Sequence, residues 1–303
     1  MVQRYRAVRR PAAIDSVLEP HSGAEQTIDW KMMLFLDLVQ SEYGPILVGV
    51  DRSSGAHVFC QQGWCQSESD VRGVSYAPYI HAMFGLIGQM PVRSVLMIGC
   101  GGGTLATMLA RDGRHVTAVD INPAAFEVAR RYFALDRTVR CCTGDGLAWL
   151  IQSDCVFDCI IIDAFDGWRI PGHLSSPAFF SLAKKHLTPS GVIMMNVLEE
   201  QERCGSADAI AANMAEAGMK VRLLEEGLAS DRNVIVLGGN VQTLLKPTLR
   251  IAPEREGEQL ERDLAGMRFR SFRVRTAACD TARRGPSLTQ GQQAVRAICP
   301  GDK

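Results

Sequence analysis

The sequence lacks the cysteine spacings that would indicate a zinc site or a redox pair, although it contains ten cysteines in 303 residues. No Cys-x-x-Cys occurs, and several cysteines lie within apolar runs, as Cys155 and Cys159 do. Buried, reduced thiols are the simplest interpretation. They are typical of a reducing compartment rather than of a secreted disulfide framework. We therefore expect a cytoplasmic protein.

The sequence also lacks an excess of charge of either sign. Its 33 Lys and Arg residues balance 33 Asp and Glu residues, so the composition does not indicate nucleic acid or an acidic membrane surface as a partner. No run of about 18 apolar residues occurs, which a membrane-spanning helix would need, and no signal-peptide segment follows the N-terminal arginines. With 47% hydrophobic residues, the chain is expected to fold around a sizeable core without a membrane segment.

Four segments of different character are expected: a weakly ordered lead-in over residues 1–30, a small antiparallel β domain over 31–75, a larger α/β domain over 76–246 and a basic, partly disordered tail over 247–303. The β domain rests on short apolar runs separated by turn residues, namely Leu34–Val39, Ile46–Val50 and His57–Cys60. The tail has eleven Lys and Arg residues against seven Asp and Glu residues. It shows no sustained apolar period, although Glu258–Met267 could form an amphipathic helix.

Between residues 76 and 246, apolar runs alternate with helical patterns. The expected strands are Ser94–Ile98, His115–Asp120, Val139–Thr143, Phe157–Asp163, Gly191–Leu198, Lys220–Leu224 and Asn233–Leu237. Helices are expected over Thr104–Arg111, from Pro123 onward, and over Ser176–Leu187 and Ala207–Gly218. Strands that are apolar throughout indicate a mostly parallel sheet buried on both faces. The sequence therefore predicts a Rossmann-like α/β fold with a mostly parallel seven-stranded sheet, whose last two strands form an antiparallel edge hairpin.

A glycine-rich turn follows the first strand of this sheet, with glycine at positions 99, 101 and 103. Because glycine has no Cβ, the backbone of Gly99, Gly101 and Gly103 can approach a ligand closely. The helix that follows presents unpaired N–H groups at its N-terminus. A dinucleotide-binding fingerprint would require glycine at position 104, where Thr104 stands. A dehydrogenase is therefore disfavoured.

Four aspartates follow these strands at their carboxyl ends, the rim at which open α/β sheets bind ligands. Asp120 is placed to bind ribose hydroxyls, and Asp145, which precedes Gly146, is placed to read an adenine amino group. Asp163 and Asp166 follow the fourth strand. As an alternative, Asp120 and Asp145 could serve only as helix N-caps. The four aspartates in register with the glycines predict a site for a nucleoside of the S-adenosylmethionine type.

Three segments resemble the spermidine synthase (polyamine aminopropyltransferase) family. Gln62–Ser67 is similar to the family's Asp-Gly-x-x-Gln segment, Tyr79–Met83 to its Tyr-His-Glu-Met segment, and Asp163–Asp166 to its Asp-Ser-Ser-Asp loop. Met97 adds to the resemblance, because ordinary methyltransferases usually carry an acid at that place. Ile170–Leu174 resembles a divergent bacterial subgroup of spermidine synthase-like proteins. The resemblance covers nearly two-thirds of the chain and includes the N-terminal β unit.

The resemblance implies an aminopropyltransferase that takes decarboxylated S-adenosylmethionine as co-substrate and a diamine, putrescine, as acceptor, with no prosthetic group. It implies that Gln66 contacts the nucleoside, that His81 and Asp166 bind the amine, and that Asp163 draws off its proton. A carboxylate suits this step because a protonated amine has no lone pair with which to attack. The aspartates have no His or third acid beside them, so no metal is expected. The family also implies a homodimer.

Two places depart from the family. Ile80 and Ala82 replace the Tyr and Glu beside His81, and the second departure is in the glycine-rich turn. The family's glycine-rich turn contains an Asp that holds the amino end of the aminopropyl group, and Gly102 stands at that place. A methyltransferase that uses intact S-adenosylmethionine on a small acceptor therefore remains an alternative, as does a nucleoside-binding protein without catalysis. Four side chains, namely His81, His173, Trp64 and Trp168, could line the acceptor pocket or have only a structural role in the core.

Overall fold

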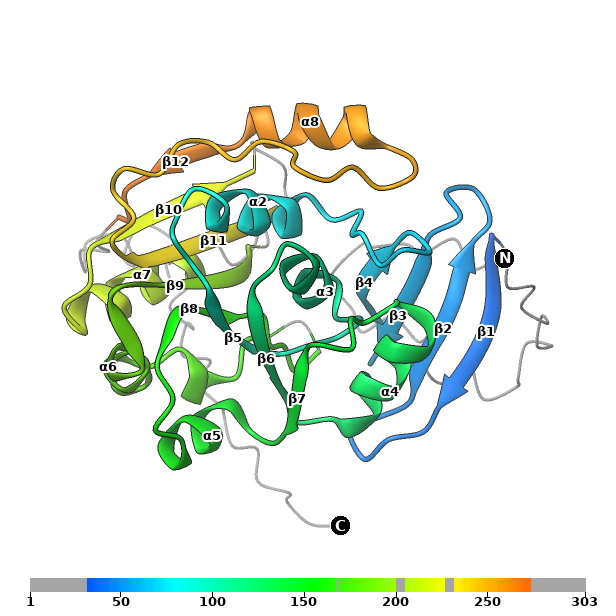
Figure 1. The fold of residues 1–303 in the computed structure, drawn as a ribbon, viewed down its shortest axis with the longest axis horizontal. Helices are drawn as coiled ribbons and strands as arrows, with labels where there is room; N and C mark the ends of the chain where they lie inside the picture. Colours follow the sequence, from blue (N-terminus) through cyan, green and yellow to red (C-terminus); the bar gives the residue numbers. More distant parts are fainter. Residues whose placement is uncertain (1–31, 168, 200–204, 227–231, 274–303) are drawn as a thin grey trace, which may run out of the picture. The chain divides into compact units, whose positions relative to one another are not determined.

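In the described part of the chain, a four-stranded sheet is followed by an eight-stranded sheet (Figure 1). The computed structural model describes residues 32–167, 169–199, 205–226 and 232–273. Residues 1–272 belong to one unit and residues 273–303 to another. The predicted lead-in and residues 274–303 of the predicted tail lie outside the described residues.

The N-terminal sheet is antiparallel, with its strands in chain order. They are β1 (Met33–Val39), β2 (Ile46–Asp51), β3 (His57–Gln61) and β4 (Trp64–Ser69). Gln62 and Gly63, with φ of 53° and 80°, form the two-residue turn between β3 and β4. The first three strands agree with the predicted apolar runs. The fourth has no counterpart in the prediction, because its residues form no apolar run.

The large sheet has the strand order β12-β10-β11-β9-β8-β5-β6-β7. Its strands are β5 (Ser94–Ile98), β6 (His115–Asp120), β7 (Arg140–Thr143), β8 (Phe157–Ile162), β9 (Leu187–Glu199), β10 (Val221–Glu225), β11 (Arg232–Gly239) and β12 (Arg268–Arg270). Strands β5 to β9 are parallel to one another, whereas β10, β11 and β12 pair in antiparallel fashion. This arrangement confirms the predicted Rossmann-like fold, with one strand more than the seven predicted.

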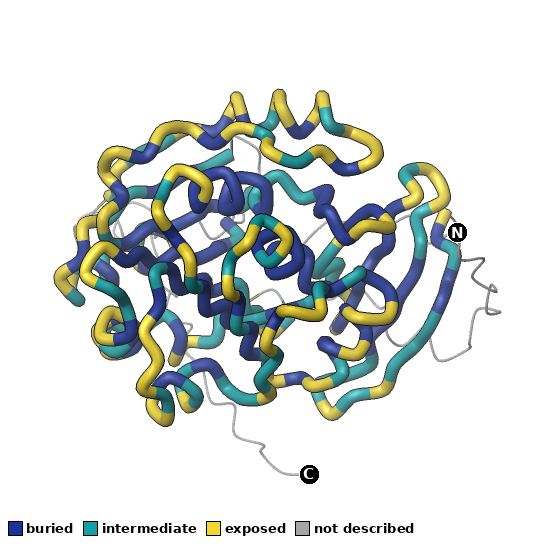
Figure 2. Tube along the Cα trace, viewed as in Figure 1, coloured by how far each residue is buried: buried dark blue, intermediate teal, exposed yellow. Residues whose placement is uncertain are grey.

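Helices cover both faces of the large sheet because its central strands are apolar on both faces. They are α2 (Pro78–Ile87), α3 (Thr104–Arg111), α4 (Pro123–Tyr132), α5 (Gly146–Gln152), α6 (Pro177–Lys185), α7 (Ser206–Glu216), α8 (Gly257–Gly266) and the short 3-10 helix η1 (Gly172–Leu174). Met97 of β5 packs in the layer of α2 and α3, whereas its neighbour Leu96 packs in the layer of α6 and α7. Buried residues accordingly follow the central strands in Figure 2. No described helix has the length and apolarity needed to cross a membrane.

Helix α4 packs against the N-terminal sheet and fixes it beside the large sheet. Its residues Val128 and Tyr132 share one apolar cluster with Val48 of β2 and Phe59 of β3. The helix begins after Asn122, whose side chain accepts the N–H of the second helical residue at 3.1 Å. As a result, β4 lies near the glycine-rich turn of the large sheet.

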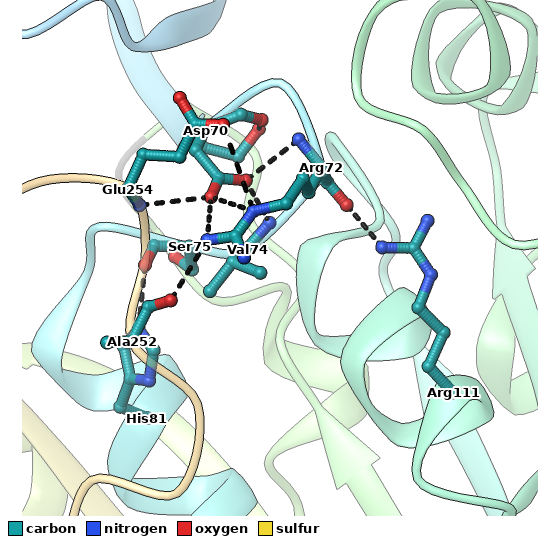
Figure 3. A network of polar contacts seen from close by, with 9 residues as sticks. Asp70, Arg72, Val74, Ser75, His81, Arg111, Ala252 and Glu254 are labelled. Atoms are coloured by element: carbon teal, nitrogen blue, oxygen red, sulfur yellow. Dashed lines mark hydrogen bonds and ion pairs between the residues drawn. The ribbon is translucent and has the colours of Figure 1, made fainter.

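A buried aspartate ties the connection between the two sheets to the C-terminal part of the core (Figure 3). The Asp70 side chain is 1% exposed and accepts the N–H groups of Arg72 and Val74 at 2.9 Å each. It also accepts the N–H of Glu254 at 3.1 Å and pairs with the Arg72 guanidinium at 2.7 Å. A buried charge is tolerated only with such partners, so Asp70 holds the segment that follows β4 in one conformation.

The predicted tail begins too early, because residues after 247 take part in the core. Helix α8 agrees with the helical pattern over Glu258–Met267. Strand β12 pairs with β10 and so occupies the edge that was predicted for a hairpin of β10 and β11. The Arg270 guanidinium lies 2.8 Å from Glu225 and 2.7 Å from Asp208. Charged residues that pair across the fold leave no apolar period in the sequence, so the sequence pattern did not indicate these contacts.

Candidate active site

A cavity of about 1040 Å³ lies at the carboxyl ends of the parallel strands, between the large sheet and the N-terminal sheet. Of the predicted site residues, those that line the cavity are Gln66, Gly99, Gly101, Asp120, Asp145, Gly146, Asp163 and Asp166. The fold thus brings together at one rim residues that are up to 100 positions apart in the sequence. Gly103 and His81 are not among the lining residues.

The glycine-rich turn is closely packed, and one of its glycines is indispensable. Gly99 has a φ of +91°, and a Cβ at this position would overlap the carbonyl group of Asp163. The next N–H, that of Cys100, donates to the Asp120 carboxylate at 2.7 Å. Gly103 is the N-cap of α3, with a φ of 68°, so it shapes the turn from behind the cavity.

At the position of the family's anchoring Asp, this chain has Gly102, and the side chains of Ser67 and Phe133 pack against it. The Gly102 N–H donates to the Ser67 hydroxyl of β4 at 2.9 Å. A Cβ at position 102 would lie 2.9 Å from the Ser67 Cβ and 3.0 Å from the Phe133 ring. There is no room here for a larger side chain. The glycine at position 102 is therefore explained by the close packing of β4 on the turn.

The carboxylate of Asp120 is held by backbone donors. It accepts the N–H of Cys100 at 2.7 Å and that of Asn122 at 2.8 Å. Burial raises the pKa of Asp120, and these hydrogen bonds offset part of that rise. Asn122, and not Asp120, is the N-cap of α4, so the interpretation of Asp120 as a helix cap is wrong.

The carboxylate of Asp145 has two structural partners. It is the N-cap of α5 and accepts the N–H of Ala148 at 2.9 Å, so the cap interpretation is correct for this residue. Its second oxygen lies 2.7 Å from Nε2 of His173. Burial alone would raise the pKa of Asp145, but these contacts outweigh it and hold the pKa below its ordinary value. His173 therefore lines the cavity beside the residue predicted to read adenine.

Asp163 follows β8 and faces the cavity from among neutral side chains. Asn196 of β9 donates its amide N–H to one carboxylate oxygen at 3.0 Å. The Tyr79 hydroxyl of α2 lies 3.4 Å from the other oxygen. Burial raises the pKa of Asp163 above its ordinary value, although both contacts act in the opposite direction. The site therefore contains a carboxyl group that takes up a proton more readily than a solvated aspartate does.

Sequence reasoning missed the roles of Tyr79 and Asn196. Asn196 is a polar residue in the otherwise apolar run from Val192 to Leu198, close to its carboxyl end. A single buried amide in such a strand is a signal that could have identified it. Tyr79 has a weaker signal, since only the fold brings the first turn of α2 to the end of β8.

The loop that carries Asp166 is joined to the N-terminal sheet. The Gln62 side chain, in the turn between β3 and β4, donates to Asp166 Oδ1 at 3.3 Å. Asp166 and Arg169 exchange backbone hydrogen bonds across the loop. Trp64 lines the cavity next to this loop, whereas Trp168 lies outside the described residues.

His81 is placed differently from the expectation that it binds the substrate. It is 1% exposed, and its Nε2 lies 2.6 Å from the carbonyl oxygen of Ser75 (Figure 3). Burial lowers the pKa of His81, which favours the neutral ring. It does not line the cavity, because α2 turns this side chain toward the segment after β4. The structure thus gives His81 a structural contact in place of the expected one.

Comparisons with known proteins find similarity to methyltransferases and to polyamine aminopropyltransferases. Residues 95–191 match the family model described as a methyltransferase domain. The polyamine aminopropyltransferase of Vibrio vulnificus is 33% identical over 195 residues, which cover 61% of this chain and 64% of that protein. The corresponding protein of Chromobacterium violaceum is 32% identical over 166 residues, which cover 52% of this chain and 62% of that protein. The chain thus spans less than two thirds of the length of these relatives.

Two further similarities bear on the fold and on the reaction. A probable spermidine synthase from Corynebacterium glutamicum has a TM-score of 0.62 and 16% identity, and the superposition covers 86% of this chain and 99% of that chain. A ubiquinone biosynthesis O-methyltransferase of Xylella fastidiosa is 32% identical over 196 residues, which cover 61% of this chain and 68% of that protein. The structural similarity concerns the fold alone, whereas the second similarity shows that the sequence likeness extends to methyltransferases.

Proposed function

Because the chain belongs to the spermidine synthase-like family within the methyltransferase fold, we propose that it transfers an aminopropyl group from decarboxylated S-adenosylmethionine to a diamine. The acceptor is putrescine, and the products are spermidine and methylthioadenosine. The observation that carries the proposal is the Asp163 carboxylate, which faces the cavity with neutral partners only and with a raised pKa. Such a group is suited to a cationic amine from which it removes a proton.

The donor is bound on the side of β5, β6 and β7. Asp120 accepts hydrogen bonds from the ribose hydroxyls, and Asp145 accepts one from the adenine amino group. The turn from Gly99 to Gly103 gives the ligand close access to the backbone, and Gln66 closes the site from β4. These roles are supported by the positions of the side chains on the cavity wall and by the backbone bonds that fix both carboxylates.

The acceptor reacts on the side of β8 and β9. Its ammonium group binds between Asp163 and Asp166, and Asp163 takes a proton from it. The freed lone pair forms a bond to the propyl carbon next to the sulfonium. The carbon–sulfur bond breaks, and its electron pair stays on sulfur as the neutral thioether of methylthioadenosine. Tyr79 and Asn196 orient the Asp163 carboxylate, so the proton acceptor is in position before the amine arrives.

A methyltransferase acting on a small acceptor is the second candidate. It is supported by Gly102, which leaves no carboxylate for the donor's amino end, and by the similarity to an O-methyltransferase. A nucleoside-binding protein without catalysis would have no use for Asp163 and Asp166 as a pair, and we rank it third.

A homodimer is proposed on the family resemblance, and a cytoplasmic location on the cysteine usage. Light scattering of the purified protein tests whether it is a dimer.

The products distinguish these candidates. Purified protein is incubated with putrescine and either decarboxylated or intact S-adenosylmethionine, and the nucleoside product is identified by mass spectrometry. Methylthioadenosine and spermidine, formed only from the decarboxylated donor, would establish aminopropyl transfer. S-adenosylhomocysteine from the intact donor would support the methyltransferase instead, and the absence of any nucleoside product would overturn both.

A further inference from the structure

Two cysteines face each other across the hairpin of β3 and β4. Cys60 and Cys65 are directly opposed in the antiparallel register, and Cys60 lies in an apolar cluster against which Cys65 packs. The turn of this hairpin has two residues, both with positive φ. In such a hairpin the pair that flanks the turn is hydrogen-bonded and the next pair, here Cys60 with Cys65, is not. Side chains approach each other most closely at these non-hydrogen-bonded positions.

Both cysteines are free thiols, and their side chains are in contact. The contact with Cys60 is the largest cause of the raised pKa of Cys65, ahead of burial and of the charge of Glu68. The Cys65 thiol also donates to Oε1 of Glu68 at 3.4 Å. Cα atoms of a non-hydrogen-bonded pair are about 4.5 Å apart, and disulfides span Cα separations of about 4.4 to 6.8 Å. The two sulfur atoms can therefore be joined without a change of strand register.

The two thiols differ in how a reagent reaches them. Cys65 is half-buried and lines the cavity, whereas Cys60 is 2% exposed and is not a lining residue. A small organic disulfide that enters the cavity is therefore attacked first by the Cys65 thiolate, and its sulfur–sulfur bond breaks with release of one thiolate. The Cys60 thiolate then attacks the Cys65 sulfur and releases the second thiolate. The two cysteines are thereby oxidised to a disulfide, and the small disulfide is reduced to two thiols, which take up the two protons.

The residues after Cys65 form the wall of the cavity beside the glycine-rich turn. Strand β4 has one extra residue, Gln66, relative to β3 at this point, and such a bulge aims a side chain. Ser67 then accepts the Gly102 N–H at 2.9 Å and packs on the turn. Most disulfides have Cα separations of about 5.5 to 6 Å, so the link would move Cys65 away from β3 by about 1 Å. The close packing at Ser67 leaves no room for this shift, so it displaces Gln66.

We propose that Cys60 and Cys65 form a reversible disulfide that weakens the binding of the nucleoside. A disulfide of this kind in a reducing compartment is transient and responds to oxidants. The effect on the nucleoside rests on the function proposed above, whereas the disulfide itself does not. Because the pKa of Cys65 is raised by Cys60, by burial and by Glu68, the attacking thiolate is scarce at neutral pH. Oxidation should therefore become faster as the pH rises.

The test treats the purified protein with bis(2-hydroxyethyl) disulfide, which is small and uncharged. Chymotrypsin cleaves after Trp64, between the two cysteines, so mass spectrometry finds their peptides joined only if the disulfide has formed. Calorimetric titration gives the affinity for methylthioadenosine before oxidation, after it and after reduction with dithiothreitol. We expect joined peptides and an affinity that falls roughly 10-fold on oxidation and is restored by dithiothreitol.

Two variants serve as controls. Cys65→Ser keeps a hydroxyl donor for Glu68 but cannot form the link, so its affinity should be the same before and after treatment. Cys155→Ser removes an exposed thiol that does not line the cavity, and its affinity should fall as that of the wild-type protein does. Thermal melting verifies that both variants are folded.

The outcomes separate this inference from the proposed function. If the reduced wild-type protein does not bind methylthioadenosine, the proposed function fails together with the effect on the nucleoside, and the joined peptides still decide whether the disulfide forms. If Cys155 is modified while Cys60 and Cys65 stay unlinked, the inference alone is overturned. Joined peptides with an unchanged affinity, or an equal fall in affinity in Cys65→Ser, would also overturn it.

Discussion

The two halves of the cavity hold their carboxylates in different ways. On the side of β6 and β7, Asp120 and Asp145 accept backbone N–H groups. On the side of β8 and β9, the donors to Asp163 come from the side chains of Asn196 and Tyr79. The first half is built from peptide groups of the sheet and its turns, and the second from side chains of strands and helices distant in sequence.

This difference matches two kinds of ligand. Backbone N–H groups place a carboxylate rigidly and neutralise part of its charge, which suits the hydroxyl and amino groups of the uncharged adenosine part of the proposed donor. Among the described residues, the hydrogen-bond partners of Asp163 are neutral side chains, and burial raises its pKa, so its negative charge is costly until a cation arrives. Under the proposed function, one rim of a parallel sheet would hold the adenosine part of the donor and the cationic acceptor side by side.

The largest effect is expected from a substitution that impairs only the acceptor half of the cavity. In Asp163→Asn the proton acceptor is lost, and we expect turnover to fall about 100- to 10,000-fold. The affinity for methylthioadenosine should stay within about twofold, because Asp163 is not among the groups assigned to the nucleoside. Steady-state kinetics and calorimetric titration measure the two quantities on the same preparation. Comparable losses of both would sink the assigned role.

The next largest effect is expected from a substitution in the nucleoside half. In Asp120→Asn, the new amide N–H groups would face the N–H of Cys100 or of Asn122. We expect the affinity for methylthioadenosine to fall about 10- to 100-fold, together with a stability loss of about 1–3 kcal/mol from the lost hydrogen bonds. Titration calorimetry and urea unfolding test this prediction. A variant with wild-type nucleoside affinity would contradict the assignment of Asp120.

A pH experiment extends the comparison to a buried carboxyl group outside the cavity wall, that of Glu226, which directly follows β10. Its pKa in the folded protein, about 7, lies above the ordinary value of 4.5. The folded state therefore binds the proton more tightly, and the group's contribution to stability falls as the pH rises from about 4.5 to about 7. Relative to wild type, Glu226→Gln should thus gain about 1–2 kcal/mol between pH 4.5 and pH 8, a figure reduced for the group's partial exposure to solvent. Urea unfolding at both pH values measures this gain, and equal differences at the two pH values would refute it.

The smallest expected effect concerns His173. Its ring supports the Asp145 carboxylate from 2.7 Å, but both side chains are partly exposed, so the contact contributes little. In His173→Ala we expect the affinity for methylthioadenosine to fall about two- to fivefold, with turnover at saturation unchanged. Kinetics over a range of donor concentrations separate the two. A large fall in turnover would instead connect His173 with the acceptor half.

The sequence predicted most of the large sheet and the position of Asp120 and Asp145 at its rim, because both depend on local patterns. The predicted helix Thr104–Arg111 and strand His115–Asp120 coincide with α3 and β6. The central parallel strands β5 and β8 are mostly apolar, and the rim aspartates lie at or soon after strand ends: Asp120 ends β6, Asp145 follows β7 by two residues and Asp163 directly follows β8. The edge strands β4 and β12 escaped detection because their residues form no apolar run. In addition, β12 has only three residues, and its partner β10 is distant in the sequence.

In the acceptor half, the sequence predicted only that the carboxylates Asp163 and Asp166 lie at the rim. Tyr79 meets Asp163 across 84 residues and Asn196 meets it across 33, and nothing in the local pattern signals such contacts. His81 shows the reverse error. A motif placed it in the substrate pocket, whereas the orientation of α2 directs its ring to the Ser75 carbonyl. Side-chain direction on a helix depends on how that helix packs, which one motif does not specify.

The most direct test of the account is the pKa of Asp163 itself. Carboxyl carbon NMR of the wild-type protein, with Asp163 identified as the resonance missing from Asp163→Asn, follows this group through a pH titration. The account predicts a pKa above the ordinary value of 3.8 in the free protein, because burial raises it, and a fall when putrescine is bound. A pKa at or below the ordinary value, or one that putrescine does not change, would contradict the claim that this half of the cavity is a cation site.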